Sequence, residues 1–127
     1  TVLSEFDRNE QVIVSAPDKL RAKALAVMEH RFRDSKLTMK DIAKEVGISL
    51  RYLNVLFEAV GTTPLVQLRE IRLQRIAVQL KEDHMANVGI AEIGRRNGIP
   101  HATHMSKLFK ARYGVTPKTW REENNTN

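Results

Sequence analysis

The sequence offers few side chains with an obvious capacity for chemistry, and the first of them are two histidines. His101 and His104 stand three residues apart, a spacing that places two imidazoles on one face of a helix and is compatible with metal binding. No carboxylate or cysteine stands close by to complete a set of metal ligands. We therefore expect no metal site there and interpret both histidines as polar side chains on an exposed helix face.

Acid–base catalysis would need paired titratable groups, and the candidates are Glu29, His30, His84, Asp41 and Glu92. They belong to no catalytic motif, because the chain has no nucleophile motif, glycine-rich phosphate loop or H-E-x-x-H pattern. The absence of cysteine excludes a disulfide scaffold, an iron–sulfur cluster and a thiol nucleophile, and it agrees with a reducing cytoplasm. We expect a cytoplasmic protein that is not an enzyme and holds no cofactor.

The distribution of charge indicates a different kind of chemistry. The 127 residues include 21 Lys and Arg against 15 Asp and Glu, which gives a net charge of +6. Residues 1–34 are neutral, whereas residues 93–121 contain no acidic side chain. The basic residues of that stretch are Arg95, Arg96, Lys107, Lys110, Arg112, Lys118 and Arg121. An excess of this kind favours a polyanionic partner such as a nucleic acid.

The elements that must position these side chains are helices. Apolar residues recur at helical spacing, no convincing strand pattern appears in the body of the chain, and no apolar run approaches the ~18–20 residues of a membrane span. Caps and glycines delimit about seven helices, over about 18–32, 38–46, 49–60, 63–81, 90–97, 100–113 and 117–122. We expect an all-α fold, with a linker over 1–17 and a disordered tail over 123–127.

Two segments of the chain repeat each other. Residues 41–48 align with residues 92–99, and Gly61-Thr62-Thr63-Pro64 aligns with Gly114-Val115-Thr116-Pro117. Each copy has a short helix, a tight turn at Gly47 or Gly98, and a second helix, which is the layout of a helix-turn-helix. An ordinary αα-hairpin has the same outline. Two matched copies on a basic chain favour the helix-turn-helix.

The sequence resembles the DNA-binding domain of the AraC/XylS family of bacterial transcription regulators over residues 18–121. The most specific stretch is GVTPKTWR at 114–121, preceded by LFKARY at 108–113. Arg51-Tyr52-Leu53 with Leu56-Phe57 in the first copy supports it. The resemblance implies two helix-turn-helix subdomains, at 18–62 and 83–122, joined by a linker helix within 63–82.

The resemblance also implies partners and a role. It implies binding to asymmetric double-stranded DNA sites as a monomer, contact with RNA polymerase, and a role as an activator. A linker helix of 18 residues would span roughly 27 Å, compatible with recognition helices in major grooves roughly 34 Å apart. Residues 1–17 could be the tail of an upstream domain, although small stand-alone members exist. A protein-interaction or RNA-binding module is the alternative.

Carried over by motif position, the first recognition helix offers six candidate residues for DNA contact. They are Ser49, Leu50, Arg51, Tyr52, Asn54 and Val55. Arg51 suits guanine, Asn54 suits adenine and Val55 suits a thymine methyl group. Ser49 and Tyr52 are expected nearer phosphate, although for Tyr52 a packing role is an equal alternative.

The second recognition helix offers a less specific set. Its candidates are His101, Ala102, Thr103, His104, Ser106 and Lys107. The expected phosphate contacts are Arg95, Arg96, Lys110, Lys118 and Arg121. Trp120 is expected to cover the core of the second subdomain.

The second copy departs from the family pattern at four positions. Gly94 stands in place of the usual alanine, Ile99 and Met105 stand where phenylalanine is common, and Gly89 offers no side chain to cap a helix. These residues predict looser packing in the second subdomain.

Overall fold

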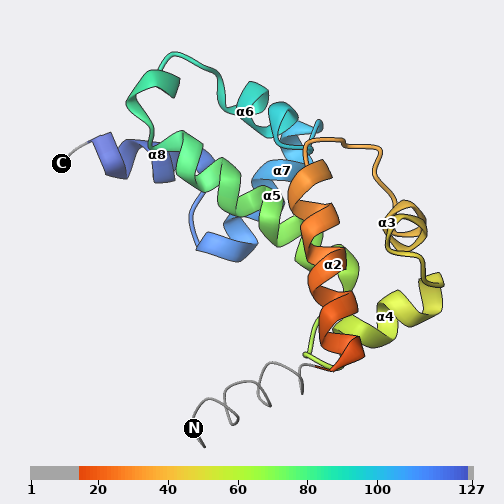
Figure 1. The fold of residues 1–127 in the computed structure, drawn as a ribbon. Helices are drawn as coiled ribbons and strands as arrows, with labels where there is room; N and C mark the ends of the chain where they lie inside the picture. The colour runs from red at the N-terminus through yellow and green to blue at the C-terminus, as the bar shows by residue number, and fades with distance from the viewer. Residues whose placement is uncertain (1–14, 126–127) are drawn as a thin grey trace, which may run out of the picture.

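The computed structural model describes residues 15–125, so most of the predicted linker (1–14) and the last two residues of the predicted tail (126–127) lie outside it. The described chain forms seven α-helices and one 3₁₀ helix, and it contains no strand (Figure 1). In order they are α2 (Ala16–Arg31), α3 (Met39–Val46), α4 (Leu50–Glu58), α5 (Pro64–Leu80), η1 (Asp83–Met85), α6 (Ile90–Arg96), α7 (Ala102–Tyr113) and α8 (Pro117–Asn125). The all-α prediction is confirmed. Among these helices, none is both long and apolar enough to cross a membrane.

The long helix α5 belongs to two hydrophobic cores. Leu68 and Ile71 in its first half are buried with α2, α3 and α4. Leu73 and Ile76 in its second half are buried with side chains of α6 and α7. Figure 1 shows α2, α3 and α4 around one end of α5, and α8 beside the other. The predicted linker helix is therefore a shared structural element of both subdomains, and its rotation about its own axis is fixed at both ends.

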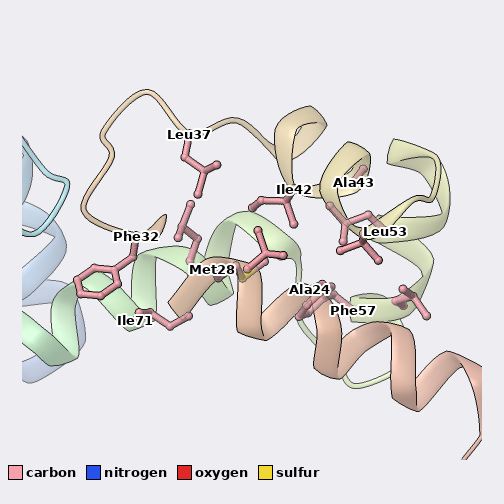
Figure 2. Close-up of a cluster of buried hydrophobic side chains, with 13 residues drawn as sticks. Ala24, Met28, Phe32, Leu37, Ile42, Ala43, Leu53, Phe57 and Ile71 are labelled. Carbon is pink, nitrogen blue, oxygen red and sulfur yellow. The ribbon is translucent and has the colours of Figure 1, made fainter. Parts of the chain in front are cut away.

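The first core forms on the predicted apolar stripe of α2. Ala24, Met28 and Phe32 recur at helical spacing and are fully buried. Figure 2 shows Ala24 and Met28 on the side of α2 that faces Ile42 of α3 and Leu53 of α4, and Phe32 at the other end of the cluster, near Ile71 of α5. Burying these side chains supplies the hydrophobic stabilisation that three short helices cannot obtain from backbone hydrogen bonds alone.

Side-chain caps begin the helices of the first subdomain where the sequence predicts them. The Thr38 hydroxyl accepts a hydrogen bond from the Asp41 amide at 3.1 Å, and the Asp41 carboxylate accepts one from the Thr38 amide at 3.0 Å. This reciprocal capping box lowers the pKa of the Asp41 carboxyl, because the ionised form accepts hydrogen bonds from Thr38. The hydroxyls of Ser49 and Thr63 cap α4 and α5 by accepting hydrogen bonds from the amides of Tyr52 and Val66, without the reciprocal bond.

The predicted repeat is confirmed by its turns. Gly47 and Gly98 have φ angles of +88° and +91°, in the left-handed region that glycine adopts without steric cost. In the first turn, the Ile48 amide donates to the carbonyl oxygen of Ala43 at 3.0 Å. At the equivalent place 51 residues later, the Ile99 amide donates to the carbonyl oxygen of Gly94 at 2.9 Å.

Several helix boundaries differ from the prediction. Helix α2 begins at Ala16 because the Ser15 hydroxyl caps it. Helix α7 begins at Ala102 and not at Pro100, since the first helical hydrogen bond is accepted by the carbonyl of His101. Helix α8 continues to Asn125, beyond the predicted end at residue 122. The 3₁₀ helix η1 was not predicted, because its three residues are too short for a periodic pattern.

The expectation of looser packing at Gly94 is wrong. Met105 is fully buried, and its side chain occupies the space beside Gly94. A β-carbon at residue 94 would lie 3.3 Å from Met105 Cε and 3.2 Å from the carbonyl oxygen of Ile99. The Met105 side chain thus lies against Gly94 and fills the space next to the missing methyl group. Gly89 does leave α6 without a side-chain cap, as expected.

Candidate nucleic-acid interface

Helix α2 holds the first helix-turn-helix in place through its basic side chains. Arg21 Nε donates to the carbonyl oxygen of Leu56 at 2.7 Å, near the end of α4. Lys23 Nζ donates to the carbonyl oxygen of Val46 at 3.4 Å, at the end of α3. Both carbonyls lie in the last turn of a helix, where no backbone amide follows to pair with them, and the cations also favour the negative end of the helix dipole. These two basic residues therefore position α3 and α4.

The exposed face of α4 brings together most of the residues predicted there. Leu50, Arg51, Asn54 and Val55 line one shallow cleft of about 550 Å³, and Glu58 lines it with them. Arg51 and Val55 are exposed and Asn54 is half-buried. An arginine, an amide and an apolar side chain on one helix face supply the groups that read guanine, adenine and thymine edges.

Glu58 is the residue of this face that the sequence analysis missed. It lies four residues after Asn54 and three after Val55, so helical spacing alone places it on the same face. Its carboxylate can accept a hydrogen bond from a cytosine amino group and repels phosphate.

Ser49 and Tyr52 lie at the edge of this face. The Ser49 hydroxyl accepts a hydrogen bond from the Tyr52 amide at 3.0 Å and so caps α4. The Tyr52 side chain is half-buried and packs against the first core. This placement favours the packing alternative for Tyr52.

The second recognition helix, α7, is fixed by an ion pair and by an aromatic cluster. Arg112 Nε donates to both carboxylate oxygens of Glu70 on α5, at 2.8 and 2.9 Å. Trp120 Nε1 donates to the carbonyl oxygen of Ala77 at 2.9 Å, and its ring meets Phe109 edge to face. Trp120 thus covers the second core, as predicted, and ties α8 to α5.

The residues predicted on α7 divide between two faces. Ala102, Thr103 and Lys107 are exposed and Ser106 is half-buried, and together they form the outward face of the helix. His101 and His104 turn toward the first subdomain and line a separate cleft. Within residues 15–125, no group of three or more histidines, aspartates and glutamates gathers as a metal site would require.

The basic residues predicted to contact phosphate differ in whether other residues already bind their side chains. Arg95 and Arg96 both pair with the carboxylate of Glu92 on α6, with a distance of 2.9 Å from Arg96 Nε to Glu92 Oε1. Arg121 is half-buried, and its guanidinium donates to the carbonyl oxygen of Met85 at 3.3 Å. Lys110 and Lys118 are exposed.

Two polar residues have structural roles that the sequence did not predict, although Arg72 belongs to the family pattern. Arg72 on α5 donates from Nε to the carbonyl oxygen of Phe32 at 2.8 Å, and from a terminal nitrogen to that of Asp34 at 2.8 Å. Asn97 is fully buried, and its side-chain amide donates to Gln79 at 2.7 Å and to the carbonyl oxygen of Ile93 at 2.8 Å. Phe32 and Asp34 are distant in sequence from Arg72, and Gln79 is distant from Asn97, so only the fold brings these partners together.

Comparisons with known proteins agree with this geometry. A family model described as a helix-turn-helix domain matches residues 20–123. The Transcriptional activator NphR of a Rhodococcus species is 32% identical over 113 residues, which cover 86% of this chain and 33% of the relative. The "Probable thc operon regulatory protein" of Rhodococcus erythropolis is 38% identical over 82 residues, which cover 64% of this chain and 25% of the relative. The chain thus spans a quarter to a third of the length of these relatives.

A solved structure has the same fold. It is a transcriptional regulator of Chromobacterium violaceum described among the AraC-type DNA-binding domain-containing proteins, with 29% identity and a TM-score of 0.75. The superposition covers 84% of this chain and 92% of that one. With two helix-turn-helix units around a shared helix and a family match over most of its length, this chain belongs to the AraC-type helix-turn-helix family of DNA-binding transcription regulators.

Proposed function

We propose that the chain binds double-stranded DNA sequence-specifically as a monomer, with α4 and α7 in adjacent major grooves of one duplex. The observation that carries this proposal is the pair of equivalent turns, at Gly47 and Gly98, one in each of two helix-turn-helix units that share the 17-residue helix α5 in their cores. At 1.5 Å per residue, α5 is about 25 Å long. Because both its ends are buried in a core, α5 sets one fixed separation between the two recognition helices.

The two recognition helices have different chemistry. Helix α4 presents Arg51 and Asn54, which can each make two hydrogen bonds to one base. Helix α7 presents Thr103, Ser106 and Lys107, which make single contacts to bases or phosphates. Because the two recognition helices of one chain differ in chemistry, we expect an asymmetric DNA site of about 15–20 bp.

The biological role follows from the relatives. One of them is named a transcriptional activator, and we extend that role to this chain, with RNA polymerase as the protein partner and the bacterial cytoplasm as the compartment. The net charge of +6 supports a polyanionic partner.

Selection of bound duplexes from a random DNA pool, followed by footprinting, tests the proposal. We expect one asymmetric site with two protected major-groove segments about one helical turn apart, occupied by one chain. If about six basic residues neutralise phosphates, log K against log salt has a slope near −5. A palindromic site with two protomers, a slope shallower than about −2, or better competition by RNA than by duplex DNA would contradict it.

A further inference from the structure

A cleft of about 460 Å³ lies between the two helix-turn-helix subdomains. It is lined by the loop between α2 and α3, by the first half of α5, and by the turn that leads from α6 into α7. Its basic and titratable lining residues are Lys36, Arg69, Arg72, His101 and His104. Among the described residues, no carboxylate side chain lines it. The cleft is therefore a concentrated basic surface that belongs to both subdomains.

Two of its cations have no partner among residues 15–125. The side chains of Lys36 and Arg69 make no hydrogen bond or ion pair with any residue in the described range 15–125. Arg72, by contrast, is held by the carbonyl oxygens of Phe32 and Asp34. Burial lowers the pKa of Arg72; the charge of Asp34 opposes this, and that of Arg69 adds to it. Like charges held this close without an acidic lining residue favour binding of an external anion.

One wall of the cleft is formed where Gly98 approaches Arg72 closely. Gly98 forms part of its lining, and a β-carbon there would lie 2.5 Å from Arg72 Nε. Because residue 98 has no side chain, the Arg72 guanidinium has room to lie against the loop that carries Lys36. Arg72 is therefore held in place at this wall by Phe32 and Asp34 and does not have to be ordered by a ligand.

We infer that this cleft receives a backbone phosphate of the DNA segment that passes between the two major grooves. The inference rests on the proposed function, since a duplex that engages α4 and α7 must pass the space between the two subdomains. His101 lines the cleft and directly precedes Ala102 and Thr103, so the cleft lies next to the outward face of α7. Lys36 and Arg69 supply the charge-assisted hydrogen bonds, and the cleft contributes to affinity and register without reading sequence.

The test uses the DNA site selected by the full chain, synthesised with neutral methylphosphonate linkages either in its central segment or at its outer ends. We expect central neutral linkages to weaken binding of the wild type. Lys36→Ala and Arg69→Ala should each weaken binding to the ordinary duplex and show little further loss on the central-linkage duplex. Each should also reduce the salt slope by about 0.9, equivalent to about 3.5-fold less loss of affinity between 50 and 200 mM salt.

Lys19→Ala is the matched control, because Lys19 is an exposed lysine of α2 that does not line the cleft. It should respond to central neutral linkages as the wild type does. If central linkages leave wild-type affinity unchanged, or if Lys36→Ala and Arg69→Ala both respond to them as fully as Lys19→Ala does, the inference is wrong while sequence-specific binding stands. Loss of all sequence preference by the wild type would instead overturn the proposed function, and this inference with it.

Discussion

Gly98 of the second subdomain lies against the backbone of Phe32 in the first, so closely that a β-carbon at residue 98 would be 2.2 Å from the Phe32 carbonyl oxygen. Arg72 on the shared helix donates to that same oxygen at 2.8 Å. Figure 2 shows the Phe32 side chain at the end of the first core, beside α5. Both subdomains and the helix between them therefore meet at one carbonyl group.

Gly98→Ala should destabilise the protein more than Gly47→Ala. Both glycines have positive φ, so alanine costs roughly 1–2 kcal/mol in either turn. Of these two glycines, only Gly98 has neighbours within 4 Å of the added β-carbon. Overpacking there should cost a further 1–3 kcal/mol, roughly. Urea unfolding of the two variants measures the difference. Equal losses of stability would show that the contact between Gly98 and Phe32 is not a constraint.

Gly94→Ala should fail to stabilise α6, although alanine has the better helix propensity by about 1 kcal/mol. The added methyl group would lie 3.3 Å from Met105, whose side chain is enclosed by the second core. The same substitution in a Met105→Ala background should be more favourable, with a coupling of at least about 0.5 kcal/mol. A double-mutant cycle of unfolding free energies measures this coupling. Additive effects would mean that Met105 does not compensate for the glycine.

Arg51→Ala should abolish preference at one or two base pairs, at a cost of about 1–3 kcal/mol of discrimination. Lys107→Ala should weaken binding to all sequences more evenly, because a single ammonium group contacts phosphate as readily as guanine. The measurement is a complete single-base substitution profile of the site for the wild type and both variants. Relaxed base preference in Lys107→Ala together with an unchanged profile in Arg51→Ala would reverse the roles assigned to α4 and α7.

Asp41→Asn should lower the stability of the first subdomain at neutral pH, and the difference from the wild type should shrink in acid. The pKa of Asp41 is lowered in the folded state by hydrogen bonds with Thr38, so its stabilising effect is present above the unfolded pKa of about 3.9. That effect is lost as pH falls through the lower, folded pKa. Denaturant midpoints between pH 7 and pH 2 measure it. Asp83→Asn is the control, since Asp83 is exposed and caps no helix with its side chain. A difference between wild type and Asp41→Asn that stays constant over this range would contradict the prediction.

The helices and the family could be predicted from local features of the sequence. The hydroxyls of Thr38, Ser49 and Thr63 each accept from the backbone amide three residues later. The positive φ at residues 47 and 98 requires glycine there. Such interactions depend on neighbours in the chain, so their residue types and spacing are sufficient to predict them. The exposed face of α4 followed from helical spacing in the same way.

Only the tertiary structure decided how the two subdomains are joined. The partners of Arg72 and Arg21 lie 40 and 35 residues away in the sequence, and both accept through backbone carbonyls, which every residue has. The fit between Gly94 and Met105 likewise depends on volumes that meet across a turn, where the sequence alone predicted weakness. The pattern of residue types does not predict which carbonyl a guanidinium binds or which space a methionine fills. Packing between segments distant in sequence determines both.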